Sequence, residues 1–428
     1  MKRIAMVSLG CPKNLVDSEL ICERFMDAGY ALVQNPEDAD VVVVNTCSFL
    51  TSAVEESIAA LLETCRSGRD VICAGCLVSR YGTELLAELP EVRLFAGPGT
   101  YDNVVHAYEA GERYLEPVFR SVVKRSFFTG TASACVKVSE GCSNHCGYCL
   151  IPSIRGELVS KPMEDVVDEC RALSDNGARE IILVAQDLGG YGKDLGMKDA
   201  LVRLVERISA IPEVEWIRIM YVHPASLTRA LVDQIDHNPK ICPYLDLPVQ
   251  HVSDRVLAAM GRKGGAAAVR EAFDLIGRAS REIWVRTTLM VGHPGEDEQA
   301  FAELEAFVAQ GPVHHLGVFA YSSEEGTRSA LMEGRPDVRT ARHRMRRIMA
   351  LQQRLSKKRL HKLRGNRIQV LIEGYHPDTE LLLKGRAAFQ APQIDGMVIV
   401  NEGGADAGTI VEVEVTDSWE YDLVGRIV

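Results

Sequence analysis

The sequence lacks long hydrophobic runs, repeats and low-complexity tracts. No apolar stretch reaches the roughly 18 residues that a membrane-spanning helix needs. The first residues, MKRIAMVSLGC, become polar too soon for a secretory signal and are typical of a buried first strand. These absences argue against a membrane or secreted protein, so we expect a cytoplasmic protein without a membrane partner.

Basic residues are also fewer than acidic residues. The 428 residues include 48 Lys and Arg against 59 Asp and Glu, which gives a net charge of -11. This excess of acid argues against broad binding of a phosphate backbone. The length suffices for two or three domains that each bury a core. Twelve cysteines in a cytoplasmic chain point to metal binding or catalysis rather than to disulfides.

The amino-terminal part, residues 1–115, is predicted to be a parallel α/β domain. Short β-branched runs alternate there with amphipathic stretches, and this order requires a parallel sheet with helices on both faces. The predicted strands are Arg3–Leu9, Asp40–Asn45 and Asp70–Ala74, and the predicted helices are Leu15–Ala28 and Ala53–Arg66.

A less regular connection, 111–130, leads to a second alternating region, 131–364. Its six strand–helix units predict a partly open (β/α) barrel with its chemistry at the carboxyl ends of the strands. The region ends in a helix, Arg339–Arg364, with eleven Lys or Arg and no acid. The predicted strands are Ala134–Val138, Glu180–Val184, Trp216–Met220, Tyr244–Leu247, Trp284–Met290 and His315–Ala320, and the predicted helices include Met163–Asp175 and Lys198–Ala210.

The carboxyl-terminal part, residues 366–428, has a different pattern. Short runs such as RIQVLIEG and TIVEVEVTD alternate apolar and polar residues between Gly, Pro and Asp. This pattern predicts a small antiparallel β-barrel.

One group of cysteines, Cys142, Cys146 and Cys149, is closely spaced in VSEGCSNHCGYCLIP. Three such thiolates can hold three irons of one four-iron–four-sulfur (4Fe–4S) cluster and leave the fourth iron open to a chelating ligand. The spacing is typical of enzymes that cleave S-adenosylmethionine (SAM) to start radical chemistry. Tyr148, between the last two cysteines, is placed to shield the cluster. Zinc is the alternative, but its only nearby fourth ligand, His145, lies inside the loop.

A second group, Cys11, Cys47 and Cys76, is dispersed in the sequence. Each cysteine lies at the carboxyl end of a predicted parallel strand, where ligands gather in open α/β sheets. The small residues that precede them would let the backbone turn toward a cofactor. We therefore predict a second 4Fe–4S cluster. These preceding residues are Gly10, Thr46 and Gly75.

Two alternatives exist for the dispersed cysteines. They can be small buried apolar residues, as we expect for Cys22, Cys65 and Cys170 within helices. Cys73 and Cys76 can also form a redox pair. However, Cys73 lies in the body of a predicted strand, where it should be buried.

With both groups in place, the chain resembles the radical-SAM methylthiotransferases over essentially its whole length. The resemblance covers an amino-terminal three-cysteine domain, a radical-SAM barrel and a terminal β-barrel of the TRAM type. Some segments are similar to the members that modify a ribosomal protein. These are VSLGCPKNLVDSE (Val7–Glu19), EGCSNHCGYCLIPSIRG (Glu140–Gly156), LVAQDLGGYG (Leu183–Gly192) and LPVQHVSDRVLAAMGR (Leu247–Arg262).

The resemblance implies a reaction. SAM would bind the open iron of the first cluster and give a 5′-deoxyadenosyl radical. The second cluster would carry the sulfur that becomes a methylthio group. The target would be the β-carbon of one aspartate in the twelfth protein of the small ribosomal subunit. An electron donor such as a flavodoxin or ferredoxin would be a partner.

The resemblance also implies roles for further residues. Tyr148, Gln186 and Asp187 would contact SAM. Arg218 would pair with the carboxylate or ribose of SAM, or else be a surface charge on a strand. Gln250 and His251 would line the cavity between the clusters, or else only shape a loop. The segment VGHPGE (Val291–Glu296) matches a family loop, although His293 stands where an aromatic residue is more usual.

Sister enzymes of this family modify an adenosine in transfer RNA, which is the alternative substrate. The terminal domain, 366–428, holds four basic residues against eleven acids, so its formal charge is 4 - 11 = -7. Such a field repels nucleic acid and attracts a basic ribosomal protein. The basic helix Arg339–Arg364 either pairs with acidic neighbours or touches ribosomal RNA.

Overall fold

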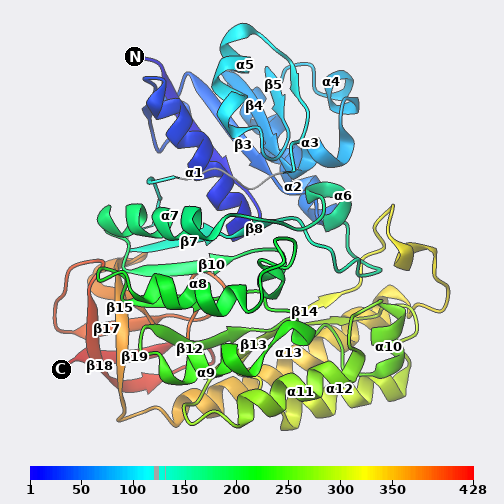
Figure 1. Ribbon diagram of the computed structural model, residues 1–428, viewed down its shortest axis with the longest axis vertical. Helices are drawn as coiled ribbons and strands as arrows, with labels where there is room; N and C mark the ends of the chain where they lie inside the picture. The colour runs from blue at the N-terminus through cyan, green and yellow to red at the C-terminus, as the bar shows by residue number, and fades with distance from the viewer. Residues whose placement is uncertain (120–124, 131) are drawn as a thin grey trace.

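The computed structural model describes residues 1–119, 125–130 and 132–428. Part of the predicted connection 111–130, and the first residue of the region 131–364, lie outside the described residues. Three units follow one another: an amino-terminal unit at the top of Figure 1, a central unit, and a terminal barrel at the lower left. Within the described ranges, no helix is long and apolar enough to cross a membrane.

The amino-terminal unit is built on a parallel sheet of six strands. Its predicted strands are confirmed within a residue or two. The additional strands β2, β5 and β6 were not predicted, because two or three residues are too few to show a repeating pattern of apolar residues. In sheet order the strands are β2 (Ala31–Leu32), β1 (Arg3–Ser8), β3 (Val41–Thr46), β4 (Asp70–Gly75), β5 (Leu94–Ala96) and β6 (Tyr114–Leu115).

Both faces of this sheet are buried because alternate residues of each strand point to opposite sides. Val41 and Val43 join the core that contains helix α1, whereas Val42 and Val44 join the core under α2 and α3. The run VVVV is therefore apolar throughout. The helices of the unit are α1 (Pro12–Asp27), α2 (Thr51–Cys65), α3 (Cys76–Tyr81), α4 (Glu84–Glu88) and α5 (Val104–Ala110).

The central unit is the predicted partly open barrel. Its six strands are all parallel and form one open sheet. In sheet order they are β14 (His315–Ala320), β13 (Trp284–Val291), β12 (Ile241–Asp246), β11 (Trp216–Ile219), β10 (Glu180–Val184) and β7 (Ser133–Lys137). A small hairpin joins β8 (Ser139–Glu140) to β9 (Val159–Ser160).

Helices cover the outer face of this sheet, and α1 of the amino-terminal unit packs against its inner face. Ile181 and Leu183 belong to the outer core, whereas Ile182 and Val184 share the inner core with Val16 and other residues of α1. The helices are α6 (Ile151–Arg155), α7 (Met163–Asp175), α8 (Ala200–Ser209), α9 (Arg229–His237), α10 (Asp254–Ala259), α11 (Gly265–Gly277), α12 (Glu298–Gln310) and α13 (Val338–His361).

The terminal unit is a closed barrel of five strands. One pair, β17 with β19, is parallel, because the chain reverses direction twice between them, once on entering β18 and once on leaving it. The other pairs are antiparallel, as the sequence predicts. Around the barrel the strands are β15 (Arg367–His376), β16 (Thr379–Ala387), β17 (Val398–Glu402), β19 (Leu423–Ile427) and β18 (Ile410–Ser418).

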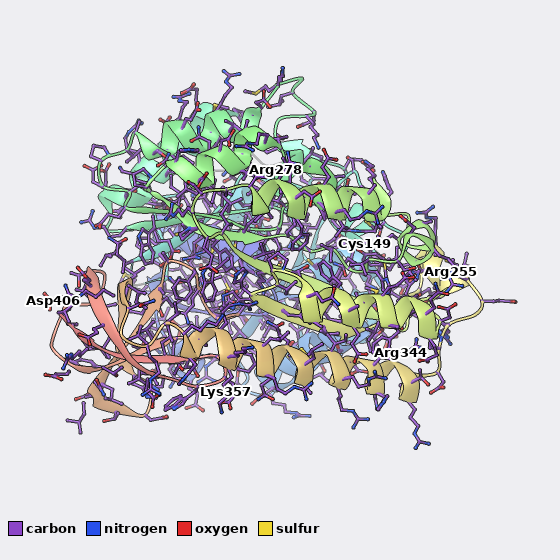
Figure 2. All side chains as sticks on the ribbon, turned by 90° about the horizontal axis from the view of Figure 1, so that it is seen from below. Cys149, Arg255, Arg278, Arg344, Lys357 and Asp406 are labelled. Atoms are coloured by element: carbon purple, nitrogen blue, oxygen red, sulfur yellow. The ribbon has the colours of Figure 1, made fainter. Side chains whose placement is uncertain are left out.

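The terminal barrel closes the amino ends of the central strands. The ring of Phe389 stacks on Trp284, the first residue of β13, with their centroids 4.1 Å apart. Asp395 pairs with Arg286 at 2.6 Å. Figure 2 shows Asp406 of this barrel on one side of the molecule and Cys149 toward the other. The carboxyl ends of the central strands therefore remain available for chemistry.

The basic helix α13 lies along the lower edge of the molecule, where Figure 2 labels Arg344 and Lys357. Arg344 pairs with Glu296 at 2.5 Å, and Lys357 pairs with Glu420 of the terminal barrel at 2.9 Å. These contacts favour the interpretation in which the basic residues pair with acidic neighbours.

A buried cluster of three charged side chains at the amino end of β10 provides a test of how the terminal barrel packs against the central unit. Glu180 is fully buried and pairs with Arg218 at 2.7 Å and with Arg386 at 2.5 Å. Burial alone would raise the pKa of Glu180, but the two guanidinium groups lower it to about 2. Its contribution to stability is therefore complete above about pH 4.5 and is lost as the pH falls through about 2.

We expect Glu180→Gln to lower the free energy of unfolding by about 3–5 kcal/mol at pH 7, because it leaves two buried cations without their counter-ion. Urea unfolding measures this loss, with Glu380→Gln on the exposed surface as the control. The wild-type protein should also lose stability more steeply than the variant between pH 4.5 and 2. Parallel pH profiles for the two proteins would contradict this account.

Candidate functional site

The first cysteine set, Cys142, Cys146 and Cys149, lies in the loop that follows β7 and β8. Backbone bonds fix this loop. The Gly147 N–H donates to the carbonyl of Met260 at 2.7 Å, and the Ser329 N–H donates to the carbonyl of Gly147 at 2.8 Å. Because partners after β12 and β14 hold the loop, the three thiols project from a rigid frame at the carboxyl ends of the strands.

The surroundings of these thiols suit a bound cation. Burial raises the pKa of Cys149 to about 12 and also raises that of Cys142. Such thiols ionise when a metal replaces the proton. The Ile151 N–H lies 3.4 Å from the Cys149 Sγ, and the Arg262 Nη1 lies 3.7 Å from the Cys146 Sγ. Both donors favour thiolates, so the residues present fit an iron–sulfur cluster.

A cavity of about 260 Å³ adjoins Cys142. On its wall, the Asp187 carboxylate accepts hydrogen bonds from the Asn144 side chain at 2.7 Å and from the Gly189 N–H at 3.1 Å. The residues around it provide both charges and several hydrogen-bonding groups, which suits a polar small molecule. The lining residues are Cys142, Ser143, Asn144, Leu158, Asp187, Gly190, Lys193, Asp194 and Lys263.

The second cysteine set, Cys11, Cys47 and Cys76, lies at the carboxyl ends of the neighbouring strands β1, β3 and β4. The structure therefore places the three cysteines at one edge of the sheet, on adjacent strands. A Cβ atom on Gly10, whose φ is +88°, would lie 3.2 Å from the Cys47 Sγ. Burial, with the charges of Cys11 and Cys47, raises the pKa of Cys76 to about 11, although Arg155 opposes this rise.

A buried ionic network joins the two cysteine sets. We call it the junction network, and its members are Asp17, Lys137, Glu140 and Arg155. Arg155, in the short helix after Cys149, places its Nη1 2.7 Å from Asp17 and its Nε 3.1 Å from the Cys76 Sγ. Lys137 bonds both Asp17 and Glu140. Each side chain of the network is at most 5% exposed.

The charges of the junction network stabilise one another. Burial alone would raise the pKa of Asp17, but Lys137 and Arg155 lower it. Burial alone would lower the pKa of Lys137, but the carboxylates of Asp17 and Glu140 raise it well above its usual value. Asp17, Lys137 and Arg155 therefore stay ionised at neutral pH. Arg155 also bonds the Asn14 Oδ1 at 2.6 Å, so the first turn of α1 is tied to the first cysteine loop.

Three predicted cofactor residues lie beside the first cysteine set. Asp187 lines the cavity, and the neighbouring Gln186 donates its amide N–H to Glu140 of the junction network at 2.9 Å. The Tyr148 ring contacts the edge of His293, with centroids 6.3 Å apart, and its hydroxyl lies 3.3 Å from Arg262. His293 thus packs as a ring at the position where the family more often has an aromatic residue.

Arg218 does not lie beside the cysteines. Its side chain is fully buried, pairs with Glu180, and donates to the carbonyl of Ala388 at 2.8 Å. These partners belong to the amino end of β10 and to the terminal barrel. The surface-charge alternative is therefore wrong, and the guanidinium is directed away from the first cysteine set.

Gln250 and His251, the two residues predicted to line the cavity between the clusters, have different surroundings. His251 is fully buried; its Nδ1 accepts from the Ser253 N–H at 3.0 Å and its Nε2 lies 3.4 Å from Glu296. This placement agrees with the loop-shaping alternative rather than with an open cavity. Gln250 is half-buried, has a φ of +71°, and bonds β13 through its backbone.

The zinc and redox alternatives gain no support. His145 is exposed and lies 3.1 Å from Glu157 rather than facing the thiols. In the part of the chain that the structure describes, no three His, Cys, Asp or Glu side chains are close enough to hold a single metal ion. Cys73 is fully buried within β4, as expected for a strand residue, and burial raises its pKa to about 12.

The sequence interpretation missed several residues that shape the site. Lys137 and Arg155 are charged residues within segments that are otherwise apolar. Such residues need buried partners, so their position was the available signal. Arg262 and Asn14 carried no comparable signal, because each stands next to another charged residue, Lys263 and Lys13 respectively.

Comparison with family models divides the chain into three parts. Residues 3–97 match the uncharacterized protein family UPF0004, residues 136–308 match the radical SAM superfamily, and residues 365–428 match the TRAM domain. The central match includes the whole first cysteine set. Together with the fold and the site, these matches define a radical SAM enzyme with a TRAM domain.

Relatives of known name match the chain over its full length. A protein of Geobacter sulfurreducens named ribosomal protein uS12 methylthiotransferase RimO is 42% identical, and the match covers 100% of this chain and 99% of that protein. A protein of Aquifex aeolicus with the same name is also 42% identical, over 99% of this chain and 97% of that protein. The chain belongs to the RimO family of radical SAM methylthiotransferases.

Solved structures share the fold at low sequence identity. The methyltransferase TsrM from Kitasatospora setae, described with cobalamin and a [4Fe-4S] cluster bound, is 14% identical with a TM-score of 0.56. The match covers 74% of this chain and 72% of that one. The cobalamin-dependent enzyme OxsB is 10% identical with a TM-score of 0.51, over 77% of this chain and 55% of that one. These matches support the architecture alone.

Proposed function

We propose that this protein adds a methylthio group to the β-carbon of an aspartate in ribosomal protein uS12. The names of its full-length relatives supply the substrate. The observation that carries the proposal is the junction network, because it links a radical SAM cysteine loop to a second, separate set of thiols. A radical enzyme that only cleaved SAM would have no use for the second set.

We assign one 4Fe–4S cluster to Cys142, Cys146 and Cys149 and another to Cys11, Cys47 and Cys76. When bound, the first supplies the electron that cleaves SAM and the second supplies the thiophilic site for sulfur. Each set offers three thiols, which leaves one iron of each cluster free for another ligand.

The surrounding side chains have roles in binding and orientation. Gln186 has a buried Oε1 without a hydrogen-bond partner in the described residues, so it can accept a bond from SAM. Asp187 fixes Asn144 at the cavity wall. Arg262 offsets negative charge on Cys146, and Tyr148 covers the inner side of the loop. These groups bind and orient SAM and exclude water from the first cysteine set.

The terminal barrel favours a basic protein as the substrate. Some of its acids serve the fold, since Asp395 pairs with Arg286 and Glu373 pairs with Arg386. Others, including Glu380 and Asp406, are exposed and attract positive charge. Because the relatives described above are named for a ribosomal protein, modification of transfer RNA is not favoured.

The proposed function also implies a cellular compartment for the protein and an electron donor as a further partner. A ribosomal substrate is available in the cytoplasm, so we assign the protein to that compartment. Cleavage of SAM consumes an electron, and we assign its delivery to a flavodoxin or ferredoxin. The ribosomal protein is modified either alone or within the small subunit.

The cluster assignment predicts the iron content. Anaerobically reconstituted protein should bind about eight irons, because each thiol set holds a four-iron cluster. Changing Cys142, Cys146 and Cys149 together to Ala should leave about four irons and abolish SAM cleavage. Changing Cys11, Cys47 and Cys76 should also leave about four irons, but SAM cleavage should persist without methylthio transfer. Cys65→Ala is the matched control, and cleavage that survives the first triple change would contradict the assignment.

The substrate assignment predicts the state of the ribosome in a deletion strain. Mass spectrometry of its ribosomal proteins should show uS12 without the methylthio group, and expression of the gene should restore it. If uS12 keeps its methylthio group while transfer RNA loses one, then the protein modifies RNA and the proposed function is wrong.

A further inference from the structure

Lys13 reaches from the amino-terminal unit into the central unit. It lies two residues after Cys11, in the first turn of α1. Its ammonium nitrogen lies 3.6 Å from the centre of the Tyr221 ring. Tyr221 follows β11, so the ammonium group is at the carboxyl ends of the central strands.

Among residues 1–119, 125–130 and 132–428, no counter-ion is in contact with the charge of Lys13. The buried lysines Lys137 and Lys161 each bond a carboxylate directly. Lys13, in contrast, makes no hydrogen bond or ion pair within the described residues, and its close partner is an aromatic face. An ammonium group has three N–H donors, and an aromatic face satisfies them poorly. A half-buried cation in this state is poised to bind an anion.

The position of Lys13 relates it to both cysteine sets. The chain connects it to Cys11 of the second set. On the other side, the carbonyl of Tyr221 accepts a hydrogen bond from the Leu188 N–H at 2.9 Å. Leu188 follows Asp187, which lines the cavity beside Cys142. The ammonium group therefore lies between residues that adjoin the two sets.

The backbone of Tyr221 supports this arrangement. Its φ is +60°, a left-handed conformation that bulky residues rarely adopt. In this conformation the Tyr221 ring lies against the ammonium group of Lys13. Asp246, at the end of β12, is a neighbouring buried carboxyl group, but it lies beyond ion-pair distance of Lys13. The ammonium group thus keeps donors available for an incoming ligand.

We propose that the ammonium group of Lys13 binds the side-chain carboxylate of the substrate aspartate and so selects aspartate over asparagine. This role rests on the proposed function. The reacting β-carbon is bonded directly to the carboxylate carbon of aspartate, and the carboxylate is unchanged by the reaction. A contact to that carboxylate therefore also fixes the position of the β-carbon between the two cysteine sets.

The experiment uses the reconstituted holoenzyme with two forms of uS12, one with the natural aspartate and one with asparagine in its place. Wild-type enzyme should prefer the aspartate form by at least tenfold. Lys13→Met should lower kcat/KM for the aspartate form by about 10- to 100-fold, as expected for a lost charge-assisted hydrogen bond. It should leave the asparagine form unaffected, so the preference should largely disappear.

Two further variants sharpen the test. Lys13→Arg keeps the charge and should restore part of the preference. Lys198→Met, which removes an exposed lysine, should behave as wild type. Iron content and SAM cleavage without substrate should be unchanged in Lys13→Met.

Several results would overturn the proposal. Equal losses on both forms of uS12, with the preference retained, would show that Lys13 only supports the fold. Loss of about four irons would assign it to the second cluster. If wild-type enzyme cleaves SAM but modifies neither form of uS12, the proposed function itself fails, which is a different result from failure of Lys13 alone.

Discussion

The site depends on a buried network of opposite charges between two units of the chain. Asp17 of α1 bonds Lys137, which ends β7, and Arg155, which follows the first cysteine loop. Buried charges are stable only when their partners are present, and removal of one partner leaves the others uncompensated. The network therefore tolerates one relative position of the two units. In that position Arg155 also reaches the Cys76 Sγ of the second cysteine set.

Helix α1 carries most of this connection. It begins directly after Cys11 and presents Lys13, Asn14 and Asp17, which are neighbours on one side of a helix, to the central unit. Its apolar residues pack against the inner face of the central sheet. At the other end of the strands, the terminal barrel closes the base through Phe389 and Asp395. The arrangement leaves the carboxyl ends of the strands as the place where both cysteine sets and a substrate can meet.

Much of the fold was predictable because its strands have strong local patterns. The buried run of β3 and the strands Glu180–Val184 and His315–Ala320 were predicted within a residue, and the cysteines at strand ends followed from the parallel order. Strands of two or three residues could not be predicted, because they carry no period. The environments of Arg218 and His251 depend on Glu180, Ala388 and Glu296, which are distant in sequence. Pairing of that kind is decided by tertiary packing, and no local pattern contains it.

The central claim is that the junction network holds the two cysteine sets in one composite site. The most direct measurement is the electron paramagnetic resonance spectrum of the reduced protein with both clusters. We predict magnetic coupling between the clusters in the wild-type protein and in Asp27→Asn, an exposed change on α1, and weakened coupling in Asp17→Asn. A wild-type spectrum that is the simple sum of two isolated clusters, or coupling that Asp17→Asn leaves unchanged, would contradict the account.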